Sequence, residues 1–139
     1  MKKKAIIISL KGYQLSNKEK ILLANEKPWG LILFKRNIKS FVQTKKLIKN
    51  IRKITRDKKF PIMVDEEGGA VTRFNKIINH NISQRDFGNF YKNNNKTGLI
   101  IYKNYINNLT IFLKKIVINI NTVPVLDVVR KNTNKIIGS

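Results

Sequence analysis

Short apolar runs alternate with amphipathic segments along the first half of this chain. The apolar runs at residues 5–10, 30–34 and 61–64 predict buried β-strands, because they are too short for helices and rich in β-branched or bulky side chains. The segments between them have the period of amphipathic helices. Strand, helix, strand, helix, strand at this spacing predicts parallel βα units, since parallel neighbours need a crossover of about a dozen residues. The pattern alone does not separate a barrel from an open sheet.

Capping signals place the two predicted helices. Ser16 and Glu19 form a reciprocal capping box at the start of the first helix, which must end before Pro28. Its apolar residues are all expected to face inward: Ile21, Leu22 and Leu23. Ser40 and Gln43 predict a second capping box, and the helix that follows has an apolar stripe opposite its lysines. That stripe comprises Leu47, Ile48, Ile51 and Ile54.

The second half of the chain is less regular. Residues 75–97 are polar and rich in asparagine, which predicts a loop with a helical turn around residues 87–91. His80, the only histidine, lies in this loop and is expected at the surface rather than in a catalytic role. Residues 98–115 predict an amphipathic helix whose aromatic stripe packs in the core, and an alternating strand over residues 117–123 then leads to Asp127.

The segment PIMVDEEGGAVTRF, residues 61–74, has the strongest chemical pattern. A predicted strand ends abruptly on acids, a glycine pair permits a sharp turn, and an arginine follows within reach of that turn. These residues are Asp65, Glu66, Glu67, Gly68, Gly69 and Arg73. An acid at the carboxyl end of a strand is typical of polar ligand sites in α/β folds. A solvated acidic turn capped by a surface arginine explains the pattern equally well, so both interpretations stay open.

Composition limits the function classes. The chain has 139 residues, enough for one domain, and no cysteine, which excludes disulfides and Cys-based zinc sites or nucleophiles. The net charge is +21, but lysines spread along the chain beside abundant asparagine and isoleucine favour composition bias over a specific nucleic-acid partner. The apolar run after Met1 ends at Lys11, too short for a secretory leader or a membrane span. We therefore expect a cytoplasmic protein without a membrane partner.

Several motifs resemble one known family. VDEEGGAVTRF (64–74) resembles the VDQEGGRVQRF signature of the family three glycoside hydrolases, in their β-N-acetylglucosaminidase branch. GYQLSNKEKILL (12–23), WGLILFKRN (29–37), NTVPVLDV (121–128) and IIGS (136–139) are similar to further segments of that family, in the same order. The chain departs from the family at Glu66, where glutamine is usual, at Ala70, where arginine is common, and at Ser9, where an aspartate is often found.

The resemblance spans residues 5–139 and implies an α/β fold, the first half of a TIM (β/α)₈ barrel whose complete form needs about 250 residues. Residues 1–139 would then be an incomplete N-terminal part of a glycoside hydrolase (β/α)₈ domain. The resemblance also implies that Asp65 accepts hydrogen bonds from sugar hydroxyls and that Arg73 lines the same site. Four further residues would support this site: Glu67, Gly68, Gly69 and Asp127. For Asp127, the pattern favours a simpler role, bracing the loop after its strand.

The implied activity is that of a β-N-acetylhexosaminidase, which releases terminal N-acetylglucosamine from small glycans such as peptidoglycan fragments, as in peptidoglycan recycling. Neither a cofactor nor a metal is implied. The family's nucleophile and acid/base belong to sequence beyond residue 139, so we expect no catalytic residue in this chain and no activity of the chain alone.

Three function classes remain open at this point. The first is a truncated β-N-acetylhexosaminidase, either a fragment or a decayed gene product. The second is a non-catalytic sugar-binding half barrel that pairs with another chain, and the third is a basic protein that binds nucleic acid through charge alone. Because half a barrel leaves two strands without a neighbour, we also expect self-association through its open edges.

Overall fold

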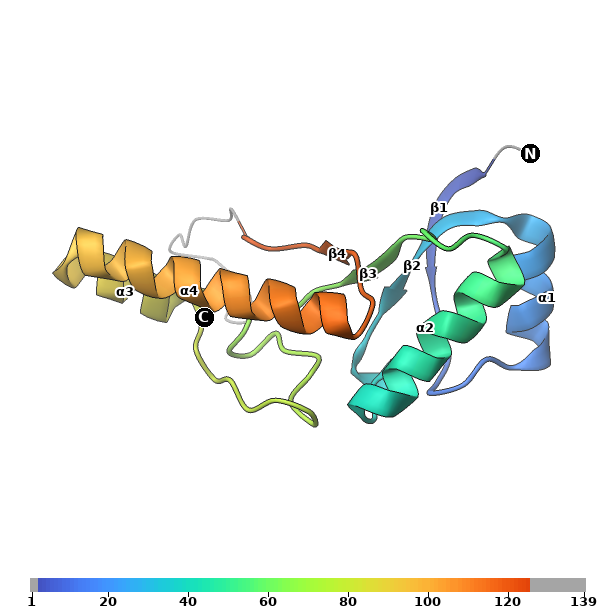
Figure 1. The fold of residues 1–139 in the computed structure, drawn as a ribbon, viewed down its shortest axis with the longest axis horizontal. Helices are drawn as coiled ribbons and strands as arrows, with labels where there is room; N and C mark the ends of the chain where they lie inside the picture. Colours follow the sequence, from blue (N-terminus) through green and yellow to red (C-terminus); the bar gives the residue numbers. More distant parts are fainter. Residues whose placement is uncertain (1–2, 126–139) are drawn as a thin grey trace, which may run out of the picture.

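The computed structural model describes residues 3–125, which form a parallel β-sheet with helices packed on it (Figure 1). The strands are β1 (Lys4–Ser9), β2 (Pro28–Leu33), β3 (Ile62–Val64) and β4 (Ile120–Asn121). The helices are α1 (Asn17–Glu26), α2 (Phe41–Thr55), α3 (Gln84–Asn93) and α4 (Asn95–Lys115), and a 3₁₀ turn, η1 (Lys35–Asn37), follows β2. The sheet order is β1-β2-β3-β4 with every neighbouring pair parallel, which confirms the predicted α/β fold of consecutive βα units.

The two faces of the sheet differ in exposure. Residues paired across parallel strands point to the same face, and the pairs Leu31–Ile62 and Leu33–Val64 are fully buried. Their core cluster includes residues of the helices: Leu23 of α1, Leu47, Ile48 and Ile51 of α2, and Leu109 and Leu113 of α4. The other face stays partly or largely exposed and carries Ile7, Ser9, Ile32, Met63 and Ile120. Asp65 shares the face of Met63, because strand residues alternate.

Two predictions of burial in the first βα unit are wrong. β1 is an edge strand of the described sheet, and Ile6 and Ile7 are 50% and 41% exposed. In α1, Leu23 is buried, but Ile21 and Leu22 are exposed. Three consecutive helical residues span about 200° of the helix surface, so they cannot all face one core. The predicted strand itself is confirmed, since β1 pairs with β2. Its burial would require a second strand on its other side.

The helix starts follow the capping signals closely. The Ser16–Glu19 capping box is present in both directions. At α2, Ser40 accepts a hydrogen bond from the amide of Gln43, but the Gln43 side chain accepts from the amide of Lys39 instead of Ser40. The prediction of a second capping box is therefore only half right: the Ser40 bond forms, but the reciprocal Gln43 bond does not. The apolar stripe of α2 is confirmed, with Leu47, Ile48 and Ile51 buried and Ile54 packed against the core.

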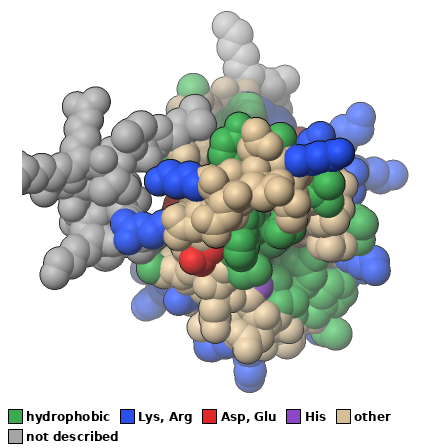
Figure 2. All heavy atoms as spheres, turned by 90° about the vertical axis from the view of Figure 1, so that its left-hand side faces the viewer, with side chains coloured by type: hydrophobic (Ala, Val, Ile, Leu, Met, Phe, Trp, Pro, Cys, Tyr) green, Lys and Arg blue, Asp and Glu red, His purple; other side chains and the backbone are tan. Residues whose placement is uncertain are grey.

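The predicted loop 75–97 contains a full helix, α3, in place of a single turn. Its N-cap Ser83 forms a capping box with Asp86, a signal that the asparagine-rich composition obscured. α3 packs along α4, and the ring of Phe87 lies 5.0 Å and 4.7 Å from the rings of Tyr102 and Tyr105. Figure 2, which faces this end of the molecule, shows exposed hydrophobic side chains between lysine or arginine side chains. Within residues 3–125, no helix combines the length and apolar character of a membrane span.

Candidate functional site

The acidic segment after β3 folds into a compact turn. Gly68 and Gly69 both have positive φ values, 86° and 56°, and the amide of Val71 donates to the carbonyl of Gly68 over 3.1 Å. The amide of Glu67 closes the turn by donating to the carbonyl of Val71. A side chain at Gly68 would place its Cβ 2.2 Å from the Ile82 carbonyl oxygen, so the turn needs glycine for its φ and for its space.

Asp65 and Arg73 meet at the carboxyl edge of the sheet. Arg73 Nη2 lies 3.4 Å from Asp65 Oδ2, which confirms that the arginine reaches back over the turn. Thr122, just after β4, donates its hydroxyl to Asp65 Oδ1 over 2.5 Å. The guanidinium also lies over the ring of Phe34, which follows β2, at 5.7 Å. Arg73 and Thr122, which follow two neighbouring strands, therefore meet at Asp65, which stays 25% exposed and can accept further hydrogen bonds.

Glu66 points to the opposite face of the sheet and is fully buried. Its Oε2 accepts the backbone amides of Arg73 and Phe74 at 2.6 and 3.2 Å. Its Oε1 accepts the Thr72 hydroxyl at 2.5 Å and lies 2.7 Å from His80 Nε2. The sequence pattern placed Glu66 among the acids at the end of the strand and marked it as a departure from the family motif, but did not predict a buried role for it. Strand alternation from Ile62 and Val64 was the signal that could have placed its side chain in the interior.

The expectation that His80 lies at the surface is wrong. Its side chain is 14% exposed and packs beside Tyr105, with 6.0 Å between the ring centroids. His80 Nδ1 and the Tyr105 hydroxyl are both buried without a hydrogen-bond partner among residues 3–125. Burial raises the pKa of Tyr105 to about 12, and the nearby Glu66 carboxylate adds to the rise by opposing a second negative charge. The turn thus rests on the buried pair of Glu66 and His80, with the ring of Tyr105 beside His80.

The remaining predicted site residues separate into two groups. Glu67, Gly68 and Gly69 form the turn, and the Glu67 carbonyl accepts a hydrogen bond from the Gln84 side chain at the start of α3 over 2.8 Å. Asp127 lies outside the described residues. Among residues 3–125, no group of three histidine, cysteine or acidic side chains could hold a metal ion.

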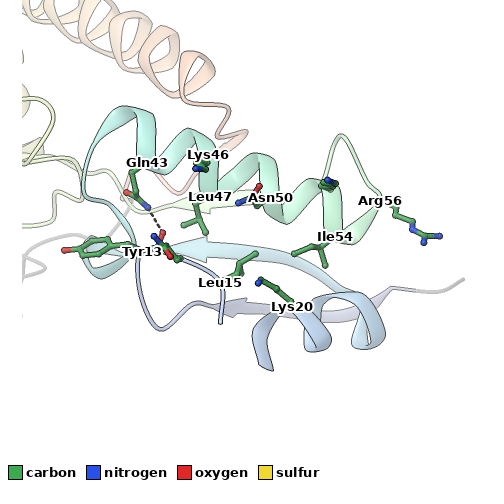
Figure 3. Close-up of a pocket in the computed structure, with 11 residues that line it drawn as sticks. Tyr13, Leu15, Lys20, Gln43, Lys46, Leu47, Asn50, Ile54 and Arg56 are labelled. Atoms are coloured by element: carbon green, nitrogen blue, oxygen red, sulfur yellow. Dashed lines mark hydrogen bonds between the residues drawn. The ribbon is translucent and has the colours of Figure 1, made fainter. Parts of the chain in front are cut away.

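A groove of about 780 Å³ lies elsewhere, between α1 and α2 (Figure 3). Its lining includes the apolar Leu15, Leu47 and Ile54 and a set of cations. These cations are Lys20, Lys46, Lys53 and Arg56, and the lining has no carboxylate. No residue of the turn at 65–74 contributes to it. Such a groove attracts anions rather than an uncharged sugar, so its volume does not make it the sugar site.

Comparison with known proteins identifies relatives over part of the chain. No family model matches. The chain is 42% identical over 69 residues to the β-hexosaminidase of Psychromonas ingrahamii, which covers 50% of this chain and 20% of the relative. It is 39% identical over 88 residues to the β-hexosaminidase of Haemophilus ducreyi, covering 63% of this chain and 25% of the relative. The matches thus span about a quarter or less of the length of these curated relatives.

Structural comparison extends the likeness in fold. A glycoside hydrolase family 3 β-N-acetylglucosaminidase from Paenibacillus sp. str. FPU-7 matches with a TM-score of 0.63 and 21% identity, over 85% of this chain and 22% of that one. The partial match agrees with the first βα units of the expected (β/α)₈ barrel. The chain is therefore similar in sequence to curated β-hexosaminidases over part of its length, and similar in fold to a glycoside hydrolase family 3 β-N-acetylglucosaminidase.

Proposed function

We propose that this chain forms the sugar-binding part of a β-N-acetylhexosaminidase that acts on terminal N-acetylglucosamine of small glycans such as peptidoglycan fragments. One observation carries the proposal: Asp65 and Arg73 lie together at the carboxyl edge of the parallel sheet, within the segment that resembles the family signature. Ligand sites of barrel folds form at this edge. Asp65 is the residue that accepts hydrogen bonds from the sugar ring, and Arg73 borders the same site.

The geometry around Asp65 suits a sugar. A carboxylate offers about four acceptor positions, and neighbouring hydroxyls of one ring can use two of them at once. Thr122 contacts Oδ1 of Asp65 and Arg73 contacts Oδ2, so the two residues hold the orientation of the carboxylate. Its remaining acceptor positions are open to solvent. The Arg73 guanidinium lies over the ring of Phe34, which helps to hold it in place. Binding by a fixed, partly exposed acid is the role that these contacts favour.

The acids of the turn are poorly arranged for hydrolysis by themselves. A retaining glycosidase needs a nucleophile and a proton donor on opposite sides of the scissile bond, with carboxyls about 5 Å apart. Asp65 and Glu66 are neighbours in an extended segment and point to opposite faces. Glu66 is also buried, and its two oxygens already accept hydrogen bonds. We therefore assign binding to Asp65 and expect the nucleophile and the acid/base in other parts of the catalytic domain.

Activity of a complete barrel tests this function. The chain is joined to the remaining barrel of a relative such as the Haemophilus ducreyi β-hexosaminidase, and hydrolysis of a nitrophenyl N-acetylglucosaminide is followed. Asp65→Ala should lower kcat/KM by roughly 30- to 1000-fold, because the loss of charge-assisted hydrogen bonds costs about 2–4 kcal/mol in the transition state. Asp57→Ala removes an acid paired with Lys3, outside the turn, and should leave kcat/KM unchanged. A folded chimera with equal activity in both variants contradicts the assignment.

A second candidate function is binding of nucleic acid through charge, and the α1–α2 groove favours it. A further hollow of about 450 Å³ adjoins this groove through Lys53 and Arg56, and every residue in its lining is a cation. Those residues are Lys49, Arg52, Lys53, Arg56 and Lys58. Arg52 is held by the Val117 carbonyl at 2.9 Å, whereas Lys49, Lys53 and Arg56 form no ion pair among residues 3–125. Phosphates can therefore approach these three cations without displacing an internal acid.

Charge reversal tests the second candidate. The triple variant Lys49→Glu, Lys53→Glu, Arg56→Glu is compared with Lys96→Glu, Lys103→Glu, Lys114→Glu, an equal change of net charge on α4. Binding of a fluorescent single-stranded oligonucleotide is measured against salt. If the groove is the site, the first triple variant binds more weakly than the second and has a shallower salt slope. Equal losses would show attraction by net charge without a site.

A further inference from the structure

A buried carboxylate holds the turn that carries the proposed sugar site. We call the contact set formed by Glu66, Thr72, His80 and the amides of Arg73 and Phe74 the Glu66 clamp. Each oxygen of Glu66 has two hydrogen-bond partners, and Glu66 is 0% exposed. An ionised carboxylate in such a place is stable only while its partners stay in position. The clamp therefore fixes the path of the main chain from residue 72 to residue 74.

The clamp acts directly on Arg73. The amide of Arg73 is bound to Glu66 at 2.6 Å, and its guanidinium reaches Asp65 at 3.4 Å. Glu66 and Asp65 therefore hold the two ends of the same residue from opposite faces of the sheet. A shift of the Glu66 carboxylate would move the Arg73 backbone and with it the guanidinium beside Asp65.

His80 is the partner of Glu66 that comes from outside the turn. It belongs to the segment before α3, and that segment packs tightly on the turn: a Cβ added at Gly69 would lie 2.9 Å from the Ser83 Cβ. Gln84 adds a hydrogen bond from its side chain to the Glu67 carbonyl. An ionised carboxylate can only accept, so with Glu66 ionised the hydrogen between His80 and Glu66 is placed on His80 Nε2. His80 thus ties the start of α3 to the turn through one charge-assisted hydrogen bond.

We propose that His80 is a positioning residue of the sugar site: its Nε2–H orients Glu66, which sets the Arg73 backbone and thereby the guanidinium beside Asp65. The proposal rests on the proposed function for its effect on sugar affinity, but the contact itself does not. It also gives a physical reason for the glutamate at position 66, where the family resemblance leads one to expect glutamine. Two carboxylate oxygens can serve two amides, a hydroxyl and an imidazole, whereas a glutamine has one acceptor oxygen.

The single histidine makes the contact measurable by ¹⁵N NMR of the full chain. The proposal requires a hydrogen on His80 Nε2 in the wild type and a changed imidazole nitrogen signature in Glu66→Gln, because the amide alters the acceptor facing the ring. It further requires faster hydrogen exchange of the Arg73 and Phe74 amides in His80→Ala than in Tyr105→Phe. The second variant removes a neighbouring hydroxyl that has no partner in the described part of the chain. These measurements need no sugar, so they test the His80–Glu66 contact even if the chain does not bind one.

Sugar affinity supplies the functional readout. His80→Ala should bind N-acetylglucosamine about tenfold more weakly than wild type, the effect of losing one net hydrogen bond to a charged group. His80→Gln keeps an N–H donor and should recover most of that loss, and Tyr105→Phe should bind like wild type. Equal losses in His80→Ala and His80→Gln, or unchanged exchange of the Arg73 and Phe74 amides in His80→Ala, would overturn the proposal. An Nε2 without hydrogen in the wild type would overturn it as well.

Discussion

Gly68→Ala is the substitution whose cost can be worked out most completely from the structure. Gly68 has a φ of 86°, and a Cβ there would lie 2.2 Å from the carbonyl oxygen of Ile82. The left-handed backbone costs an alanine roughly 1–2 kcal/mol. The overlap with a backbone atom adds about 1–3 kcal/mol, the range found for overpacked sites. The less flexible unfolded chain returns about 0.4–1 kcal/mol. We expect a net loss of about 1–5 kcal/mol in the free energy of unfolding.

Gly88→Ala is the matched control for this prediction. Gly88 lies inside α3 and is not among the glycines with positive φ, and a methyl group there would have no other atom within 4 Å. Alanine should stabilise the chain at this position by roughly 0.5–1 kcal/mol, through helix propensity. Urea unfolding followed by circular dichroism and by the fluorescence of Trp29, the only tryptophan, measures both changes. A Gly68→Ala chain that unfolds at the wild-type urea concentration would refute the description of the turn.

Three further predictions concern the chain as a whole. The folded pKa of Tyr105 lies near 12, above the ordinary value of 10.0, so its contribution to stability is complete below pH 10 and is lost as the pH rises to about 12. The free energy of unfolding in urea should therefore fall more over that pH range in the wild type than in Tyr105→Phe. Equal decreases in the two proteins would contradict this. The exposed edge strand β1, with Ile6 and Ile7, should drive self-association in sedimentation experiments, and a monomer at all concentrations would argue against it. Finally, residues 1–139 alone should release no nitrophenol from a nitrophenyl N-acetylglucosaminide, and turnover that disappears in Asp65→Ala would show that the chain is itself an enzyme.

Local sequence signals predicted which helices and strands form better than they predicted how each of them is buried. The stripe of α2 and the Ser16 capping box were predictable because the residues involved lie within a few positions of each other. The burial of β1 was not, since it depends on whether a second strand lies beside it. β4 is only two residues long although the alternating pattern covers seven, because its neighbour β3 offers only three residues for pairing.

The site shows the same division. The reach of Arg73 over the turn followed from its spacing to Asp65 and from the glycine pair between them. The role of Glu66 did not follow, because its hydrogen bonds come from residues six to fourteen positions away. His80 was misjudged for the same reason: its polar neighbours in sequence predict exposure, whereas its neighbours in space are Glu66 and Tyr105. The sequence pattern therefore predicted the contact between Asp65 and Arg73 and missed the buried residues Glu66 and His80 beside the turn.

Sugar binding by the turn is the central claim, and a titration of the ¹⁵N-labelled chain with N-acetylglucosamine tests it most directly. We predict that the amides from Glu67 to Phe74 and the amide of Thr122 shift in a saturable manner, since Arg73 and Thr122 contact Asp65 and the turn joins Asp65 to Arg73. Asp65→Ala should abolish the shifts, and Asp57→Ala, which removes an acid paired with Lys3, should leave them intact. Shifts that are absent from the turn in the folded wild type, or that persist unchanged in Asp65→Ala, would contradict the claim.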